Sequence, residues 1–433
     1  MVHSQSEEKL EFKLDPDNEL RFEVPGNHST DKKKKTYVEL KSGNAEIFGS
    51  EMTVGKKYIF SPGSRIPIYS WQGGNIEING PVSYSPVISR ETPMIMYLNT
   101  HAALEQLRRK ADTDQSRGPV VMIVGPTDVG KSSVTKMLLN YAVRVGRRPV
   151  YVDLDVGQGG LSCPGTIGGM LVERPAMIEE GFPQVAPLVF HYGHTSPTYN
   201  LPLYNQLVSK LANVINSRLE QNKKACASGV IINTCGTTND KTAYASDTYK
   251  IITHTALEFE VDVIIVLDGE SLYNDLIKDM PSFVKVVFQP KSGGIVERNY
   301  SVRNEARIRR VKDYFYGVKN NFHPHTFQVN FSDVKIYKIR ESKSTKSAFR
   351  SKLSRIYPDK DKDIDLSNHL LGVCFNTGTD DEVMGSNIAG FICVKKVDIE
   401  NSLLTVLSPQ PAPLPKTTLI YSEMTFADFV DSK

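Results

Sequence analysis

The chain has 433 residues, enough for two or three domains and a large apolar core. Its net charge of +3, with 40% hydrophobic and 23% charged residues, is ordinary for a globular protein. This balance excludes a protein that binds nucleic acid by charge over its whole surface. No apolar run approaches the roughly 20 residues of a membrane span, so we expect no membrane partner.

Cysteine usage and the amino terminus indicate the compartment. The five cysteines form no Cys-x-x-Cys pair and no Cys/His cluster with metal-ligand spacing. Most lie in apolar surroundings, as buried cysteines do in a reducing compartment. The polar amino-terminal sequence MVHSQSEEKLEF argues against a secretory signal. We therefore expect a cytosolic or nuclear protein.

Short alternating segments fill the first predicted domain, residues 1–98. Pro-Gly and Gly-Gly turns separate them, which predicts a small β-sandwich or barrel. The expected strands are 10–14, 19–24, 37–40, 45–48, 58–60, 66–71 and 75–78. The lysine run at 32–35 is either a solvated loop, which we favour, or a local nucleic-acid contact.

A phosphate-binding motif opens the second predicted domain, residues 99–320. Val120–Val124 is a continuous apolar run, as in a parallel strand covered on both faces. GPTDVGKS follows and fits G-x-x-x-x-G-K-[ST], and the next residues have helical apolar spacing. In such a loop backbone N–H groups surround phosphates, Lys131 reaches the β- and γ-phosphates, and the Ser132 hydroxyl binds Mg²⁺. A chance glycine turn is the alternative, and both flanks disfavour it.

Strands and helices alternate through the rest of this domain. The pattern predicts an α/β fold with a parallel sheet, helices on both faces, and ligands beyond the carboxyl ends of the strands. Expected strands are 149–154, 229–233, 261–267 and 285–289; expected helices are 204–220, 248–259 and 271–279.

Two acids end the strand VYVDLD and are candidates for catalysis. Asp153 and Asp155 are two residues apart, so both share one face of the strand. Asp155 lies nearer the phosphates, and we predict that it is the general base and helps to hold the metal, with Asp153 supporting it. Capping of the next element is the alternative.

Other polar residues are weaker candidates for the functional site. Asp268 follows a strand, and we favour helix capping over a nucleotide contact. His191 and His194 have no third ligand nearby, so substrate contact or loop packing is favoured over a zinc site. No N-K-x-D motif follows a strand, which favours ATP over GTP.

The chain becomes basic after the central domain and then turns to alternating strands again. Residues 298–312 carry six basic residues against one acid, and a helix here would cover the nucleotide pocket if it folds back. A solvated basic helix is the alternative. Residues 321–433 predict a third, β-rich domain with strands at 327–331, 334–339, 371–375, 388–394, 403–407 and 418–421, and a charged, mobile insertion at 341–363.

The order of GPTDVGKSS, GRRPVYVDLDVGQGG, PGTIGG, IINTCG, PKSGGIVER and DYFYG resembles the Clp-type polyribonucleotide 5′-hydroxyl kinases. The resemblance covers nearly the whole chain. It implies a nuclear subunit shared by the mRNA 3′-end cleavage factor and the tRNA-splicing endonuclease complex. The implied partners are RNA 5′ ends, a cleavage-factor scaffold protein and tRNA-splicing endonuclease subunits.

The resemblance also implies roles for individual residues, with ATP between the first two domains. Glu19 would read the adenine amino group and Arg65 would pack on the base. Arg298 and Arg303 would stabilise the transferring γ-phosphate and grip RNA. The triphosphate and Mg²⁺ would be held by Gly125, Thr127, Asp128, Val129, Gly130, Lys131, Ser132 and Ser133, and Asp155 would deprotonate the RNA 5′-hydroxyl.

One departure concerns RNA capture. Family members carry a tryptophan after NTCG that stacks on an RNA base, and here the residue is Thr237. Its loss would weaken RNA capture roughly 5- to 150-fold unless another aromatic residue such as Tyr244 substitutes. We expect an ATP-dependent RNA 5′-hydroxyl kinase. The alternatives are an ATP-bound scaffold subunit and a small-molecule kinase, and the arginine-rich segment argues against the latter.

Overall fold

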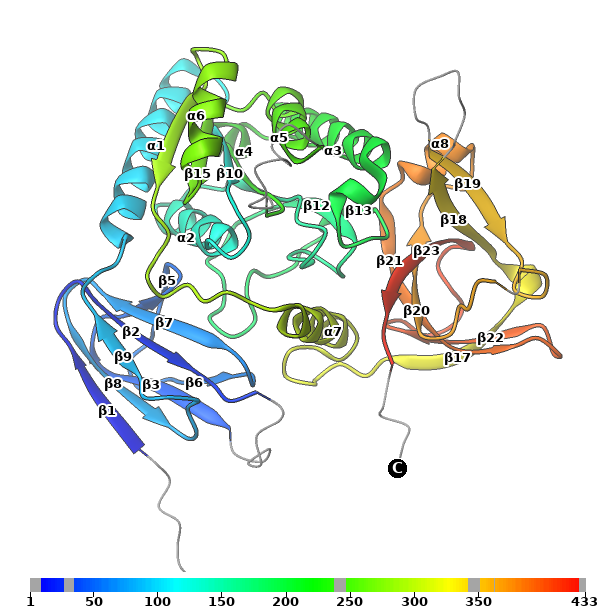
Figure 1. Ribbon diagram of the computed structural model, residues 1–433, viewed down its shortest axis with the longest axis horizontal. Helices are drawn as coiled ribbons and strands as arrows, with labels where there is room; N and C mark the ends of the chain where they lie inside the picture. Colours follow the sequence, from blue (N-terminus) through cyan, green and yellow to red (C-terminus); the bar gives the residue numbers. More distant parts are fainter. Residues whose placement is uncertain (1–8, 27–34, 237–246, 342–350, 362, 428–433) are drawn as a thin grey trace, which may run out of the picture.

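Three parts of the chain follow one another in space in the computed structural model (Figure 1). A β-sandwich lies at one end, a layered α/β unit in the middle, and a second β-rich unit at the other end. The structure describes residues 9–26, 35–236, 247–341, 351–361 and 363–427. Within these ranges no helix is long and apolar enough to cross a membrane.

The amino-terminal part is a sandwich of two antiparallel sheets, as predicted. The first sheet has the order β1 (Lys9–Leu14), β8 (Gly74–Asn79), β3 (Thr36–Gly43), β6 (Lys57–Phe60). The second has the order β5 (Ser50–Glu51), β4 (Glu46–Ile47), β7 (Arg65–Ser70), β2 (Asn18–Glu23), β9 (Val87–Ser89). Alternate residues such as Ile66 and Ile68 point into the shared core, because side chains along a strand alternate between faces. Glu19, Arg21 and Arg65 therefore lie on the sheet that faces the central part.

A seven-stranded sheet forms the middle of the molecule. Its order is β13 (Leu188–His191), β12 (Thr166–Leu171), β11 (Val150–Asp153), β14 (Val230–Asn233), β10 (Val120–Val124), β15 (Val263–Leu267), β16 (Lys285–Gln289). The five strands from β11 to β16 are parallel, as predicted, and β12 and β13 add an antiparallel edge that the sequence pattern did not predict. The Gly168-Gly169 pair makes β12 resemble a turn in sequence, yet a Cβ on Gly168 would lie only 2.5 Å from the Leu188 carbonyl oxygen.

Helices cover both faces of this sheet. Val121 and Ile123 pack with α1 (Met94–Asp114) and α2 (Lys131–Arg144). Val120, Met122 and Val124 face the opposite core, which contains α3 (Leu201–Gln221), α4 (Lys223–Ser228), α5 (Asp247–Glu258) and α6 (Glu270–Asp279). The domain border predicted after residue 98 falls inside α1. The sandwich is thus connected to the central part by a continuous helix.

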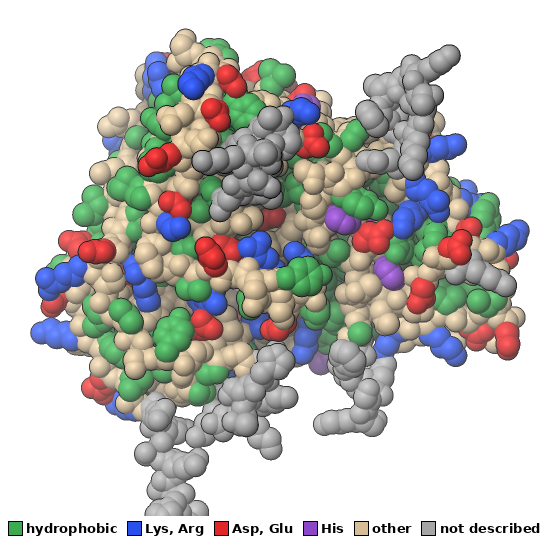
Figure 2. All heavy atoms as spheres, viewed as in Figure 1, with side chains coloured by type: hydrophobic (Ala, Val, Ile, Leu, Met, Phe, Trp, Pro, Cys, Tyr) green, Lys and Arg blue, Asp and Glu red, His purple; other side chains and the backbone are tan. Residues whose placement is uncertain are grey.

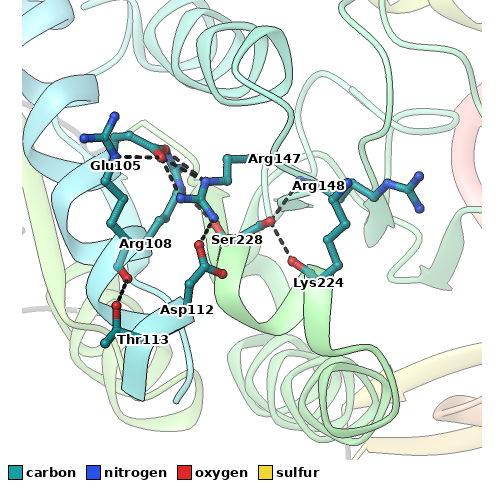
Figure 3. A network of polar contacts seen from close by, with 9 residues as sticks. Glu105, Arg108, Asp112, Thr113, Arg147, Arg148, Lys224 and Ser228 are labelled. Carbon is teal, nitrogen blue, oxygen red and sulfur yellow. Dashed lines mark hydrogen bonds and ion pairs between the residues drawn. The ribbon is translucent and has the colours of Figure 1, made fainter. Parts of the chain in front are cut away.

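A polar network holds α1 at the amino ends of the strands, on the edge opposite the site described below (Figure 3). The Arg108 side chain is only 1% exposed, and its Nε donates to the Ser228 carbonyl oxygen at the end of α4, at 2.9 Å. Arg147, just before β11, pairs with Glu105 at 2.6 Å and with Asp112 at 2.5 Å. These contacts join α1, α4 and the start of β11.

The basic segment folds back as α7 (Tyr300–Tyr316) and leads to the carboxyl-terminal sheet. Its helix begins later than predicted, because the Asn299 side chain caps it by accepting the Val302 N–H at 2.9 Å. The sheet has the order β17 (His325–Asn330), β22 (Leu403–Ser408), β21 (Ile388–Asp398), β20 (His369–Cys374), β23 (Thr418–Thr425), β18 (Lys335–Glu341), β19 (Ser351–Ile356), with a short helix α8 (Asp380–Met384).

Part of the predicted mobile insertion is an ordered strand. Residues 351–356 form β19, which pairs antiparallel with β18. The prediction was wrong there because charge dominated the sequence pattern, whereas Leu353 and Ile356 are buried in two different apolar clusters. The predicted border between the second and third domains, after residue 320, lies between α7 and β17. The five cysteines, all of which the structure describes, form no disulfide.

Candidate nucleotide and phosphoryl-transfer site

A cleft of about 580 Å³ lies at the carboxyl ends of the central parallel strands. The loop after β10 forms its floor, strands β2 and β7 of the sandwich form one wall, and the start of α7 covers it. Every predicted site residue except Gly125 lines it: Glu19, Arg65, Thr127, Asp128, Val129, Gly130, Lys131, Ser132, Ser133, Asp155, Arg298 and Arg303. Residues far apart in sequence thus converge on one space, large enough for a nucleotide.

Two glycines shape the loop between β10 and α2. Gly125 has φ 145° and Gly130 has φ 93°, which L-residues with side chains rarely adopt. A Cβ on Gly125 would also lie 2.3 Å from the Leu267 carbonyl oxygen, so Gly125 sits behind the loop and lets it approach β15. The amino end of α2 then points its free N–H groups into the cleft, which favours an anion there.

Lys131 is held inside this loop. Its side chain is 6% exposed, and its Nζ donates to the carbonyl oxygens of Pro126 at 2.6 Å and Gly125 at 3.1 Å. Burial lowers the pKa of Lys131 to about 8, although the Asp155 carboxylate opposes that shift. A phosphate in the cleft would offer this ammonium a stronger, charged acceptor than the two carbonyls.

Asp128 binds both predicted arginines of the basic segment. Arg298 donates to its carboxylate from the backbone N at 2.9 Å and from Nε at 3.0 Å. Arg303 Nη2 lies 2.6 Å from the same carboxylate, and Arg303 Nε donates to the Arg298 carbonyl oxygen at 2.9 Å. Burial acts to raise the pKa of Asp128, but these arginine contacts outweigh it and hold the pKa below its usual value. Both guanidinium groups are therefore fixed at the mouth of the cleft.

The two acids after β11 have different surroundings. Asp153 is buried and accepts from Asn233 Nδ2 at 2.9 Å and from the Gly160 N–H at 2.8 Å, so its oxygens are occupied. Asp155 lines the cleft and accepts the Gly157 N–H at 2.9 Å. Burial raises the pKa of Asp155, which makes its carboxylate a better proton acceptor than an ordinary aspartate. Asp155 is thus the acid that faces the cleft, and Asp153 is the acid held by Asn233 and Gly160.

Ser132 meets the same network, and the donors suit a magnesium ion. Its Oγ lies 3.4 Å from Asn233 Oδ1, which connects the helix start to Asp153. The described residues hold no group of three or more His, Cys, Asp or Glu side chains with metal-binding geometry. Mg²⁺ is usually bound by one or two protein oxygens together with phosphates and water, so the Ser132 hydroxyl and Asp155 carboxylate fit it.

The sandwich contributes charged side chains to the wall of the cleft. Glu19 is buried, and its carboxylate accepts from Arg21 Nε at 2.5 Å. Arg65 Nε donates to Glu23 at 2.8 Å, and its Nη1 lies 3.5 Å from the Val296 carbonyl oxygen in the segment before α7. Glu19 and Arg65 thus lie at the end of the cleft away from Asp155, where the base of a nucleotide would lie if its phosphates occupy the loop.

Three lining residues, Arg21, Gln158 and Arg307, were not predicted as site residues, nor was Asn233, which contacts Ser132. Arg307 Nε donates to the Gly157 carbonyl oxygen at 3.0 Å, and Arg310 Nε donates to that of Gly159 at 2.7 Å. The alternative of a solvated basic helix is therefore wrong for these residues. Their spacing of three along a helix, beside a glycine-rich loop with free carbonyls, is the signal that could have identified them.

The remaining candidates lie elsewhere. Asp268 pairs with Lys291 at 2.9 Å, and α6 is capped by Gly269, so the favoured capping role is wrong. His191 is buried, and its ring lies 3.0 Å from the Tyr421 carbonyl oxygen, which agrees with packing. Most of the lysine run, together with Thr237 and Tyr244, lies outside the described residues.

Comparisons with known proteins agree with this geometry. Three family models match: the N-terminal β-sandwich domain of polyadenylation factor over residues 13–111, the mRNA cleavage and polyadenylation factor CLP1 P-loop over 125–317, and the pre-mRNA cleavage complex II protein Clp1 over 322–428. A CLP1 homolog from Culex quinquefasciatus is 49% identical over 431 residues, covering 97% of this chain and 98% of that protein.

A human relative and two solved structures extend the likeness. The human polyribonucleotide 5′-hydroxyl-kinase Clp1 is 47% identical over 426 residues, covering 96% of each chain. Two complexes of Clp1p with Pcf11p, one concerned with ATP loss in a point mutant, give TM-scores of 0.84 and 0.81 at 22% identity. They cover 97% of this chain and 99% of theirs, and so share its fold. This chain belongs to the Clp1 family, as its motifs predicted.

Proposed function

We propose that the protein transfers the γ-phosphoryl group of ATP to the 5′-hydroxyl end of RNA. The observation that carries this proposal is the convergence of Lys131, Asp155, Arg298 and Arg303 on one cleft beside a phosphate-binding loop. Phosphoryl transfer requires positioned reactants and cations around the transferring group rather than covalent chemistry by the protein. The names of the human and other mammalian relatives, which are polyribonucleotide 5′-hydroxyl-kinases, support the same reaction.

Each residue has a defined task in this reaction. The loop from Gly125 to Ser133 holds the phosphates through backbone N–H groups, and Lys131 exchanges its two carbonyl contacts for phosphate oxygens. Asp155 accepts the proton of the RNA 5′-hydroxyl as that oxygen bonds to the γ-phosphorus and the bond to the ADP oxygen breaks. Arg298 and Arg303 stabilise the charge that develops on the transferring group.

A magnesium ion would sit between the phosphates and the protein oxygens. Ser132 and Asp155 are the residues that would hold it, and Asn233 would orient Ser132. When bound, the ion would neutralise phosphate charge.

Label transfer tests the proposal. The protein is incubated with γ-labelled ATP and a 5′-hydroxyl oligoribonucleotide beside the Lys131→Ala variant. We expect label on the RNA with the natural chain and a loss of 100-fold or more with the variant, because Lys131 holds the transferring phosphate. Equal, background-level labelling by both would overturn the proposal.

The origin of the cleft walls in two different domains supports a second function. Glu19 and Arg65 come from the sandwich and Lys131 from the central part, so a nucleotide would connect two domains. ATP could then serve as a structural ligand of a scaffold subunit. In that case ATP co-purifies unhydrolysed, and Glu19→Ala releases both the nucleotide and the partner protein. A nucleotide-free protein that binds its partner normally would exclude this function.

The proposal also covers partners and location. The complexes of Clp1p with Pcf11p support a scaffold protein of the mRNA cleavage machinery as a partner. We extend the proposal to RNA 5′ ends, to subunits of the tRNA-splicing endonuclease and to the nucleus. Co-purification from nuclear extract with a tagged chain tests these assignments, and absence of cleavage-factor and splicing-endonuclease subunits from the eluate would contradict them.

A further inference from the structure

Two stacked rings flank, in sequence, a segment of the cleft wall that lies near the loop after Asp155. The rings of His194 and Tyr199 stack with their centroids 3.9 Å apart and their planes within 8°. Tyr199 is nevertheless 55% exposed. Because His194 covers one face of the tyrosine ring, the exposed surface lies on its other face and edge. An exposed aromatic face of this kind is a natural contact for a flat ligand.

The segment that carries the pair forms part of the cleft wall. Thr195, Ser196 and Pro197, which lie between the two rings in sequence, all line the cleft. The Thr195 carbonyl oxygen lies only 3.3 Å from where a Cβ on Gly157 would be. The ring pair therefore stands next to the loop that follows Asp155, and so near the position of the RNA 5′ end.

Buried contacts hold this segment rigidly. The Tyr192 hydroxyl lies 3.0 Å from the carbonyl oxygens of both Ser196 and Pro197. The Ser196 N–H donates to His194 Nδ1 at 3.0 Å, which fixes the imidazole plane. Tyr192 packs edge-on against Tyr204, whose hydroxyl donates to the Leu154 carbonyl oxygen at 2.9 Å. Since Leu154 immediately precedes Asp155, the ring pair and the proposed base share one support.

Positive side chains continue from this point onto the carboxyl-terminal sheet. Lys338 Nζ lies 4.6 Å above the centre of the Tyr421 ring and pairs with Glu423 at 2.8 Å, so a phosphate would compete with this acid for it. Arg340 follows on the same face of β18. Lys352 of β19 is paired directly opposite Arg340. Figure 2 shows His, Lys and Arg side chains where the central part meets this sheet, with Asp or Glu side chains between them. Such a row suits the phosphates of a single strand.

We propose that the His194–Tyr199 pair is the stacking platform for a base near the 5′ end of the RNA. The strand then passes over the row formed by Lys338, Arg340 and Lys352. This inference rests on the proposed function for the identity of the ligand, but it concerns RNA binding rather than phosphoryl transfer. It assigns the base contact to residues of the β13–α3 connection.

Binding of a 3′-fluorescein, 5′-hydroxyl oligoribonucleotide in the presence of a non-hydrolysable ATP analogue tests the proposal. Tyr199→Ala should weaken binding roughly 5- to 150-fold, and Tyr199→Phe should restore it, because stacking needs the ring and not the hydroxyl. Phe283→Ala is the matched control, since Phe283 is 74% exposed but precedes β16 at the opposite edge of the sheet. ATP affinity should be unchanged in all three variants.

Oligonucleotides with an abasic site at the first or second position separate stacking from a structural role. The natural chain should lose affinity for the abasic RNA, whereas Tyr199→Ala should bind both RNAs equally. If Tyr199→Ala binds like the natural chain, or loses affinity equally for both RNAs, the inference is overturned. A natural chain that binds RNA in this Tyr199-dependent way without transferring label supports the platform and overturns the kinase proposal instead. If the natural chain transfers label but its RNA binding does not depend on Tyr199, the kinase proposal is supported and the platform is overturned.

Discussion

Asp128 and Arg303 form an ion pair at 2.6 Å that links the phosphate-binding loop to the first turn of α7. Arg298 binds the same carboxylate through its side chain and its backbone. The two arginines are thus held at the cleft mouth by an acid that lies within the loop itself. Phosphate oxygens in the cleft would compete with Asp128 for these donors.

Loss of this acid should loosen the start of α7. Asp128→Asn keeps a residue that tolerates the positive φ of 56° at this position but removes the charge that holds both arginines. Hydrogen bonds to charged groups contribute about 1.5–3 kcal/mol, so backbone amides of residues 298–303 should exchange at least about tenfold faster in the nucleotide-free protein. Hydrogen exchange followed by mass spectrometry measures this.

Asp268→Asn is the control for that experiment. Asp268 forms its ion pair with Lys291 on the same side of the sheet but does not contact α7. Exchange in 298–303 should be unchanged in this variant. Equal exchange rates in the natural chain and Asp128→Asn would show that the Asp128 contacts do not hold the helix.

Glu19 should determine the preference for adenine. Its carboxylate can accept from the adenine amino group, whereas the guanine carbonyl at the same position would meet a negative charge. Glu19→Gln should weaken ATP binding at least about tenfold and narrow the difference between ATP and GTP, because the amide can also donate. Calorimetric titration with both nucleotides measures this. Unaltered affinity for both would remove Glu19 from the base site.

The rate of label transfer should fall both at low pH and at high pH. Burial raises the pKa of Asp155, so this base is protonated and inactive at a higher pH than an ordinary aspartate, whose pKa is about 3.9. The rate should therefore fall as pH decreases through that raised value. Burial lowers the pKa of Lys131 to about 8, so ATP binding should weaken above that pH as the ammonium loses its charge. A profile that is flat from pH 4 to pH 9 would contradict both assignments.

The network in Figure 3 should contribute to stability and not to catalysis. Arg108→Ala removes a side chain that is 1% exposed and leaves the Ser228 carbonyl oxygen without its donor. We expect a loss of about 2–4 kcal/mol in the free energy of unfolding. Arg109→Ala removes a neighbouring arginine whose side chain is 76% exposed and should cost less than about 0.5 kcal/mol. Urea denaturation followed by circular dichroism compares the two, and equal losses would contradict the structural role.

The parts of the fold that depend on strict hydrophobic patterns could be predicted from sequence. Val120–Val124, the loop after it and α2 were located correctly because a buried parallel strand and a phosphate loop each leave a local signal. β12 and β13 were missed because both are buried along nearly their whole length and so show no alternation, and β12 contains two glycines. β19 was missed because its buried residues are three apart and Lys352 and Arg355 stand between and beside them, so it shows no regular alternation.

Site residues could be predicted from sequence where a local motif contains them. Lys131, Ser132 and Asp155 could be found from local spacing, because the first two begin α2 directly after the loop and Asp155 follows β11. The ion pair between Asp128 and Arg303 spans 175 positions, and only the return of α7 over the loop creates it. The stack of His194 and Tyr199 could not be predicted from sequence either, because no motif contains both residues and only the turn between them brings their rings together.

The most direct test of the central claim is the single-turnover rate of the Asp155→Asn variant with 5′-hydroxyl RNA and saturating ATP. Asparagine keeps the oxygen that accepts the Gly157 N–H, so the loop should be preserved and ATP binding retained. The predicted result is a rate roughly 10²- to 10⁴-fold below that of the natural chain, as expected for loss of a general base. A rate within twofold of the natural chain would show that Asp155 does not take the proton.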